Sequence, residues 1–263
     1  MRRFLKKANA GLELLGPDLR KTRVSAKAYP GYRRDLSELR GQEGSAATVF
    51  PLGDSRPCLG EDVADSGQAK GHYFHQDLLV ARRIFERNPH IHVDVGSRVD
   101  GFVAHVASFR PIEVFDIRPL PAGIANIDST QLDLMAPLPE ELKDYCDSLS
   151  CLHALEHFGL GRYGDPVDYD GYLVGLENLG KILRSGGVFY LSVPIGPQRI
   201  EFNAHRVFSI DYLLGVLQDS YRIERFSFVD DDGELHEDVL LGSERQTNFG
   251  CNYGCGIFEM AKL

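Results

Sequence analysis

The sequence predicts an α/β fold built on a doubly wound, mostly parallel sheet of seven strands with a C-terminal antiparallel hairpin. From residue 91 onward, short apolar runs alternate with amphipathic stretches. Near-continuous apolar strands between helices are typical of a parallel sheet that is covered on both faces. The last two runs, 222–229 and 256–263, have no clear helix between them, which favours an antiparallel pair over another crossover.

Each element follows from its own pattern. The stretch 73–89 carries apolar residues at helical spacing and ends at Pro89. The stretch 171–187 has a leucine-rich face and stops at Gly186 and Gly187, a pair typical of a left-handed helix cap. A shorter helix is expected over 101–109. The other five strands are expected over 91–96, 112–118, 123–129, 188–195 and, ending near Ala154, within 147–158.

Residues 1–71 form a basic and irregular N-terminal extension, and 72–263 form the domain. Residues 1–16 show helical spacing, whereas the prolines and glycines from 16 to 71 indicate loops and short helices. Residues 1–40 hold eleven Lys and Arg and four Asp and Glu, a charge of +7, so the rest carries −9 − 7 = −16. The acidic body argues against a nucleic-acid partner. Residues 1–15 either contact an anionic membrane or a protein partner, or are a solvated leader.

The location and the metal content are predicted from absences. No apolar run is long enough to span a bilayer, and the N-terminus lacks the core of a secretory signal. Five cysteines without a framework spacing favour a reduced, cytoplasmic protein, with peripheral membrane contact left open. We expect no metal, because Cys251 and Cys255 have no second ligand pair and because His153 and His157 straddle a strand end.

A glycine loop follows the first strand, in "VDVGSRVDGF" at 93–102. Gly96 and Gly101 have the spacing of a phosphate-binding P-loop, but Phe102 stands where that loop needs a lysine. Arg98 stands where a dinucleotide loop needs its middle glycine, which disfavours NAD. S-adenosylmethionine has ribose and adenine without a phosphate, and it fits this loop better. Asp116, twenty residues after Gly96, ends the second strand and is placed to accept the ribose hydroxyls.

Three later stretches resemble the class I S-adenosylmethionine-dependent methyltransferases. They are "DSLSCLHALEHFG", "LGKILRSGGVFYLSVP" and "HRVFSIDYLLGVL", and with the glycine loop they extend the resemblance over about 72–263. "HVDVGSRVDGFVAHVASF", "DIRPL" and "LHALEHFGLGRYGDP" look closer still to an uncharacterised bacterial branch associated with surface-polysaccharide biosynthesis. The resemblance implies a Rossmann-like fold and S-adenosylmethionine as the cofactor.

The same resemblance implies which residues contact the cofactor. It places Asp94, Gly96 and Ser97 near the methionine amino end, and Asp116 with Ile117 at the ribose. Asp128 is the candidate for the adenine amine, with Asp133 as the fallback. The segment from His153 to His157 is implied to line the floor beside the sulfonium.

The acceptor side has candidates from the residues themselves. A sulfonium methyl is already activated, so alignment of an acceptor matters most, and a base assists a hydroxyl. His205, past the fifth strand, is either that base or a helix-start cap, and His157 is the next candidate. Arg162, Tyr163 and Asp165 lie on a glycine-rich loop and are candidates for holding a small polar acceptor such as a sugar.

Three functions stay open on the sequence alone. The first is O-methylation of a sugar or another small polar acceptor in glycan biosynthesis. The second is a non-catalytic, S-adenosylmethionine-binding scaffold that kept the fold. The third is an NAD-linked oxidoreductase, against which the glycine spacing argues.

Overall fold

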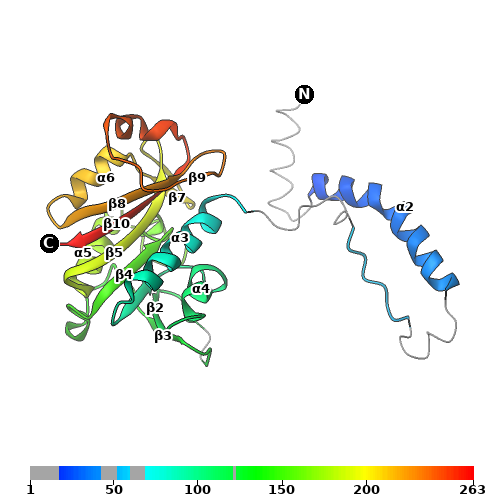
Figure 1. Ribbon diagram of the computed structural model, residues 1–263, viewed down its shortest axis with the longest axis horizontal. Coiled ribbons are helices and arrows are strands. Elements are labelled where there is room, and N and C mark those ends of the chain that lie inside the picture. The colour runs from blue at the N-terminus through cyan, green and yellow to red at the C-terminus, as the bar shows by residue number, and fades with distance from the viewer. Residues whose placement is uncertain (1–17, 43–51, 60–68, 121–122) are drawn as a thin grey trace. The chain divides into compact units, whose positions relative to one another are not determined.

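A computed structural model describes residues 18–42, 52–59, 69–120 and 123–263, and the chain divides into two units, Met1–Gln68 and Ala69–Leu263. Among its described residues, the first unit contains one long helix, α2 (Leu19–Gly41), with Pro30 inside it (Figure 1). The sequence predicted loops and short helices there, since most α2 side chains are exposed and a solvated helix lacks an apolar period. The predicted helical segment 1–16, including the contact segment 1–15, lies outside the described residues.

The second unit is built on an eight-stranded sheet in the order β3-β2-β1-β4-β5-β10-β8-β9, with a separate two-stranded sheet β6-β7 (Figure 1). Its elements are α3 (His72–Arg87), β1 (His92–Val95), η3 (Val99–Val103), α4 (Ala104–Ala107), β2 (Ile112–Asp116), β3 (Ile127–Gln131), η4 (Glu140–Leu142), β4 (Cys146–Leu152), η5 (Leu155–His157), α5 (Gly171–Ile182), β5 (Leu183–Ile195), β6 (Arg199–Glu201), β7 (His205–Val207), α6 (Ile210–Leu217), β8 (Tyr221–Val229), β9 (Leu235–His236), η6 (Ser243–Gly250) and β10 (Gly254–Lys262).

The strand directions confirm the predicted fold class. Strands β3, β2, β1, β4 and β5 pair in parallel, and β10 runs antiparallel between β5 and β8. All seven predicted strands are present, and the two-residue β9 is the eighth. Several boundaries differ from the predictions. The strand expected over 123–129 spans Ile127–Gln131, and the strand expected from 188 starts at Leu183. The helix that begins at Gly171 ends at Ile182 instead of near Gly186, because β5 already starts at Leu183.

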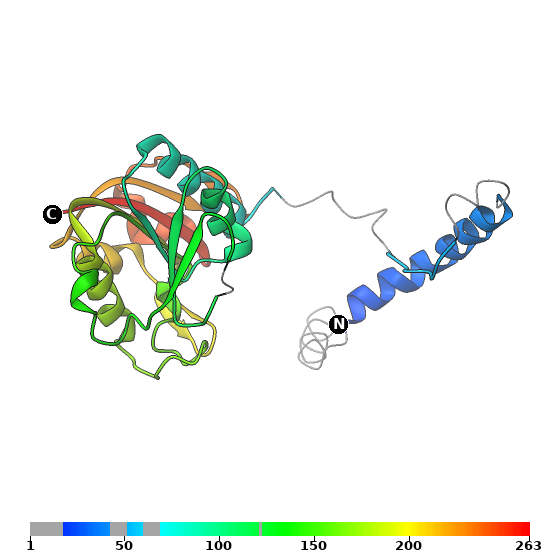
Figure 2. The ribbon, with the colours of Figure 1, turned by 90° about the horizontal axis from the view of Figure 1, so that it is seen from below.

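Helices cover both faces of the sheet, and each face has its own apolar core (Figures 1 and 2). On one face, Leu79, Val80 and Ile84 of α3 pack with the buried side chains of η3 and α4. On the other face, α5 and α6 contribute Leu179 and Leu213. Apolar side chains on both sides explain why the parallel strands are continuous apolar runs in the sequence.

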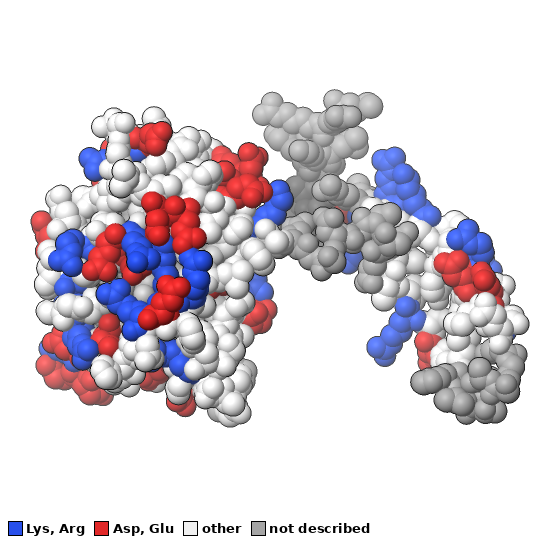
Figure 3. Space-filling view, in the orientation of Figure 1, with Lys and Arg blue, Asp and Glu red and all other residues white. Residues whose placement is uncertain are grey.

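Acidic and basic side chains alternate on the face of the second unit that Figure 3 shows. Ion pairs join α3 to the C-terminal strands, such as Arg87 with Glu224 at 3.4 Å. Among the ion pairs that α3 makes within the described residues, the most buried is Arg83 with Glu259, whose Nη1 and Oε2 atoms are 3.2 Å apart and whose side chains are 2% and 6% exposed. None of the helices within the described ranges has the length and apolar character needed to cross a membrane.

Candidate functional site

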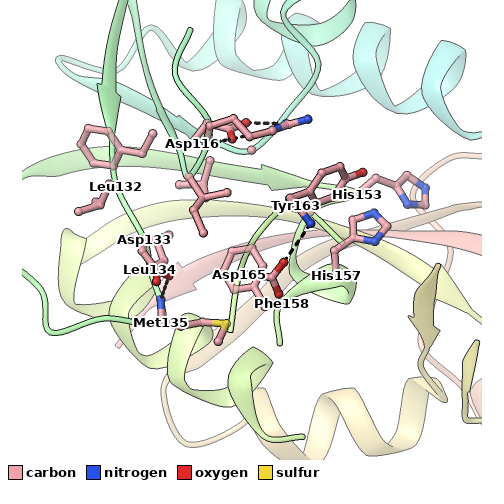
Figure 4. Close-up of a pocket in the computed structure, with 16 residues that line it drawn as sticks. Asp116, Leu132, Asp133, Leu134, Met135, His153, His157, Phe158, Tyr163 and Asp165 are labelled. Carbon is pink, nitrogen blue, oxygen red and sulfur yellow. Dashed lines mark hydrogen bonds and ion pairs between the residues drawn. The ribbon is translucent and has the colours of Figure 1, made fainter. Parts of the chain in front are cut away.

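A pocket with about 560 Å³ of empty space, part of it open to solvent, lies where β1, β2 and β4 end (Figure 4). Strand order reverses there, because β2 lies on one side of β1 and β4 on the other. In open α/β sheets, ligands bind at the carboxyl ends of the strands at such a reversal. The pocket is lined by Val95, Gly96, Phe115, Asp116, Ile117, Arg118, Leu132, Asp133, Leu134, Met135, His153, Ala154, His157, Phe158, Tyr163 and Asp165.

The turn after β1 requires a glycine. Gly96 has φ +70°, a conformation that side chains rarely adopt, and a Cβ atom on it would lie 2.9 Å from the Cβ atom of Ala154. The absence of a side chain therefore keeps β1 close to the chain after β4 at the pocket wall. Arg98, which replaces the middle glycine of a dinucleotide loop, is exposed and pairs with Asp100 at 2.8 Å, and it does not line the pocket.

Asp94 and Ser97 form an internal brace and do not line the pocket. The Asp94 carboxylate accepts bonds from the Ser97 backbone N–H (3.1 Å), the Ser97 hydroxyl (2.7 Å) and the Ser150 hydroxyl (2.6 Å). Burial raises the pKa of Asp94 to about 6. Both residues were expected at the methionine amino end. Instead, the Asp94 carboxylate holds β1, β4 and the glycine loop together.

Asp116 lines the pocket at the end of β2, but Arg118 already binds both of its oxygens. Asp116 Oδ1 accepts from the backbone N–H (2.8 Å) and Nε (2.9 Å) of Arg118, and Oδ2 accepts from Nη2 (2.7 Å). The guanidinium of Arg118 lies 4.5 Å from the ring centre of Tyr163. A ligand that needs both carboxylate oxygens must therefore displace Arg118. Ile117, between the two residues, also lines the pocket.

The segment after β3 forms the apolar wall opposite the histidines, and it contains Leu132, Leu134 and Met135 (Figure 4). Asp133 lines the pocket, and its Oδ1 accepts the backbone N–H of Met135 at 2.8 Å. Asp128 lies within β3 and does not line the pocket. Asp133, the fallback candidate for the adenine amine, is thus at the pocket. Asp128, the first candidate, lies five residues earlier, within β3.

Two histidines from the segment after β4 face the side of the pocket away from Met135 (Figure 4). Nδ1 of His153 donates to Oε1 of the buried Glu156 at 2.7 Å, and Nδ1 of His157 donates to the carbonyl of Ala204 at 2.6 Å. Both bonds use Nδ1 of the ring and not Nε2. Burial lowers the pKa of His157, so its ring is neutral near pH 7. Burial also opposes a charge on His153, but Cys255 and Glu156 raise its pKa well above the usual range.

His205 is next to the pocket but does not line it. Its ring centre is 6.5 Å from that of His157 and 5.0 Å from that of Tyr253. Nε2 of His205 is 3.3 Å from Oε2 of Glu201, which is an ion-pair distance without a hydrogen bond. His205 starts β7, so the expected role as a helix-start cap belongs instead to Ser209, whose hydroxyl accepts the backbone N–H of Tyr212 at the start of α6.

The three acceptor candidates divide between the pocket and its rim. Tyr163 and Asp165 line the pocket. The Asp165 carboxylate accepts the backbone N–H groups of Gly161 and Tyr163, both at 3.1 Å, so it shapes its own loop. Arg162 does not line the pocket, and it donates to the carbonyl of Ala204 at 3.0 Å.

Sequence reasoning missed two residues that shape this site, Arg118 and Glu156. Arg118 follows Asp116 by two residues, a spacing at which a side chain beyond a strand end can turn back to the carboxylate. Glu156 stands between the two histidines and is 1% exposed. A carboxylate next to histidines in an apolar segment was the available signal, because a buried charge needs a partner.

Comparisons with known proteins bear on the fold. A family model described as "Caenorhabditis protein of unknown function, DUF268" matches residues 125–232. No curated protein sequence matches the chain.

Among solved structures, the [4+2]-cyclase SpnF is 13% identical, with a TM-score of 0.50, over 75% of this chain and 85% of that one. The N-methyltransferase NodS from Bradyrhizobium japonicum WM9, solved with S-adenosylhomocysteine, is 11% identical, with a TM-score of 0.49, over 73% and 88%. At such identities the likeness concerns the fold alone, and the second unit shares a Rossmann-like fold with SpnF.

Proposed function

We propose that the second unit binds S-adenosylmethionine in the pocket and transfers its methyl group to a hydroxyl of a small polar acceptor, a sugar in glycan biosynthesis. The observation that supports this proposal most directly is the composition of one pocket at the strand-order reversal. The pocket combines the Gly96 turn, a strand-end carboxylate at Asp116, an apolar wall after β3 and a histidine-lined side.

The lining residues fit the cofactor. Gly96 lines the pocket without a side chain, so the methionine end can approach its backbone. Asp116 is the acceptor for ribose hydroxyls, and Leu132, Leu134 and Met135 give a flat adenine an apolar wall. Asp133 supplies a carboxylate beside that wall for the adenine amine. When bound, the cofactor supplies a methyl group on a positively charged sulfur, which needs no further activation.

The residues of this chain would align the acceptor and take its proton. His157 lines the pocket as a neutral ring whose hydrogen bond uses Nδ1 and not Nε2, so we assign the base to His157, with His205 behind it as the alternative. Tyr163 at the pocket and Arg162 at its rim are the polar contacts proposed for a saccharide, on a loop that Asp165 shapes. Because His157 must be neutral to act, turnover is expected to fall only at a pH below its lowered pKa.

The position of Arg118 favours a second candidate function, a scaffold that binds the cofactor without turnover. Its three hydrogen bonds to Asp116 occupy the position where the ribose is expected. An NAD-linked oxidoreductase is the weaker alternative, and Arg98 in the glycine loop argues against it.

The test has a binding arm and a turnover arm. Isothermal titration with S-adenosylmethionine, S-adenosylhomocysteine and NADH identifies the cofactor class. Transfer of a labelled methyl group is then measured on a panel of nucleotide sugars and saccharides. We expect binding of the first two ligands and labelling of at least one saccharide, with a loss of about 10²-fold in His157→Ala. Binding without labelling of any acceptor in the panel favours the scaffold, and binding of NADH alone refutes the proposal.

A further inference from the structure

Three side chains with metal-binding atoms meet next to the pocket although they are far apart in the sequence. His72 is the first residue of α3, His153 follows β4, and Cys255 lies on β10. One ligand atom from each residue lies within 4.8 Å of the other two. We propose that His72, His153 and Cys255 bind a transition-metal ion of the zinc class.

His153 has the arrangement of a metal-binding histidine. Its Nδ1 donates to Glu156 at 2.7 Å, and its Nε2 is buried with no hydrogen-bond partner. A metal-bound histidine commonly donates its other ring N–H to a carboxylate, which fixes the ring and leaves the second nitrogen for the metal. His153 also has φ +51°, an uncommon conformation for a residue other than glycine. Such outliers cluster at functional sites.

Cys255 contributes a sulfur that lacks a strong hydrogen bond. The residue is fully buried, and the hydrogen bonds of its thiol are long, to Gln76 Oε1 at 3.7 Å and to the Gly256 carbonyl at 4.0 Å. Gln76 Oε1 accepts a shorter hydrogen bond from the Ser192 hydroxyl, at 2.6 Å. A buried thiolate beside imidazole nitrogens is a ligand set that suits zinc and related metals.

His72 completes the set from the first turn of α3. Its ring centre lies 5.1 Å from that of His153 and 5.3 Å from that of Tyr253. Tetrahedral zinc holds nitrogen and sulfur ligands about 3.3–3.7 Å apart, so the three atoms need to approach one another by about 1 Å. A half-buried residue at a helix start can make that adjustment.

Three protein ligands leave the fourth tetrahedral position for water or an exchangeable ligand. His153 also lines the pocket, so the ion would border the site described above. No spacing pattern in the sequence indicates this set, because its members are 81 and 102 residues apart. The proposal replaces the expectation of no metal, which weighed His153 with His157 and Cys251 with Cys255. It does not depend on the proposed methyl transfer.

The test uses the full chain in a Cys58→Ser background, which removes the one exposed thiol among the described residues. The protein is stripped with a chelator and titrated with Zn²⁺ against a chromophoric chelator, and then with Co²⁺. We expect one equivalent to bind, with a thiolate-to-cobalt absorption band. Cys255→Ser and His72→Ala should each weaken Zn²⁺ binding at least tenfold, and Cys255→Ser should abolish the band. Cys251→Ser, a second buried cysteine, and His105→Ala, an exposed histidine, should bind as the parent does.

Circular dichroism of each metal-free variant shows whether it is folded. If His153→Ala does not fold, the His72 and Cys255 variants decide the question. Absence of stoichiometric Zn²⁺ binding by the parent overturns the proposal, as does unchanged binding by folded Cys255→Ser. Rapid alkylation of Cys255 in a parent that binds no metal would identify a reactive thiol paired with His153 in place of a metal site.

Discussion

Replacing Asp116 by alanine is expected to weaken S-adenosylmethionine binding without unfolding the pocket. The Asp116 side chain is 3% exposed, whereas Arg118, its partner, is 48% exposed. Loss of the carboxylate therefore releases a guanidinium that water can solvate. The fold loses little, while the ligand loses the acceptor for its ribose.

The magnitude follows from the bonds that Asp116 already makes. A carboxylate has about four acceptor positions, and Arg118 fills three of them. One ribose hydroxyl can use the fourth position while Arg118 stays in place. A hydrogen bond to a charged group contributes about 1.5–3 kcal/mol, so Asp116→Ala should weaken binding by about 10- to 150-fold. Arg118→Ala frees both oxygens for the two hydroxyls and is expected to tighten binding.

The assay is isothermal titration of both variants and of Asp128→Ala, a matched control on the neighbouring strand that does not line the pocket. Asp128→Ala should bind as the wild type does. If Asp116→Ala binds with wild-type affinity, the ribose does not use this carboxylate and the orientation proposed for the cofactor is refuted. If Arg118→Ala weakens binding, Arg118 is itself a ligand contact.

Three further predictions concern stability. Burial raises the pKa of Asp94 from 3.8 to about 6, so the unfolded chain ionises first and the native state loses up to about 3 kcal/mol as the pH rises from 4 to 7. In Asp94→Asn, the free energy of unfolding measured with urea should not fall between pH 4 and pH 7 by this amount. The same pH dependence in the variant as in the wild type would contradict the prediction. A Cβ atom on Gly159, at φ +77°, would lie 2.0 Å from a backbone oxygen, so Gly159→Ala should destabilise by about 3 kcal/mol or more. Gly215→Ala, in open space on α6, should stabilise by about 0.5–1 kcal/mol. In thermal melts, Gly159→Ala should therefore lower the melting temperature and Gly215→Ala should raise it. Glu259→Ala leaves the buried Arg83 without its most buried partner and should destabilise by about 3–5 kcal/mol, so a urea midpoint near wild type would show the pair to be dispensable.

The sequence was sufficient for the elements whose burial shows in their pattern. Strands such as β4 and β5 are apolar because both faces are covered, and α3 has one apolar face because it packs on the sheet. Helix α2 has no such pattern, since it is mostly exposed, and it was not predicted. The end of α5 was misplaced because the chain enters β5 before it reaches Gly186.

The site was predictable where position along a strand decides it. Gly96, Asp116 and His157 lie at or shortly after strand ends, and all three line the pocket. Orientation was not predictable, because Asp94 faces a serine that is 56 residues away. The proximity of His72 and Cys255 was likewise not predictable, because it depends on how α3 packs near β10 in the folded sheet.

In the free protein, the Arg118 side chain competes with a ligand for the carboxylate oxygens of Asp116. A ligand that needs both carboxylate oxygens binds only the molecules in which Arg118 has moved, so its apparent dissociation constant is the intrinsic one divided by that fraction. If Arg118 has moved away from Asp116 in about one molecule in ten, the apparent affinity is about tenfold weaker than the intrinsic affinity. An anionic acceptor that holds Arg118 away from Asp116 would remove this penalty. Cofactor and acceptor would then bind cooperatively, each raising the affinity for the other by the same factor.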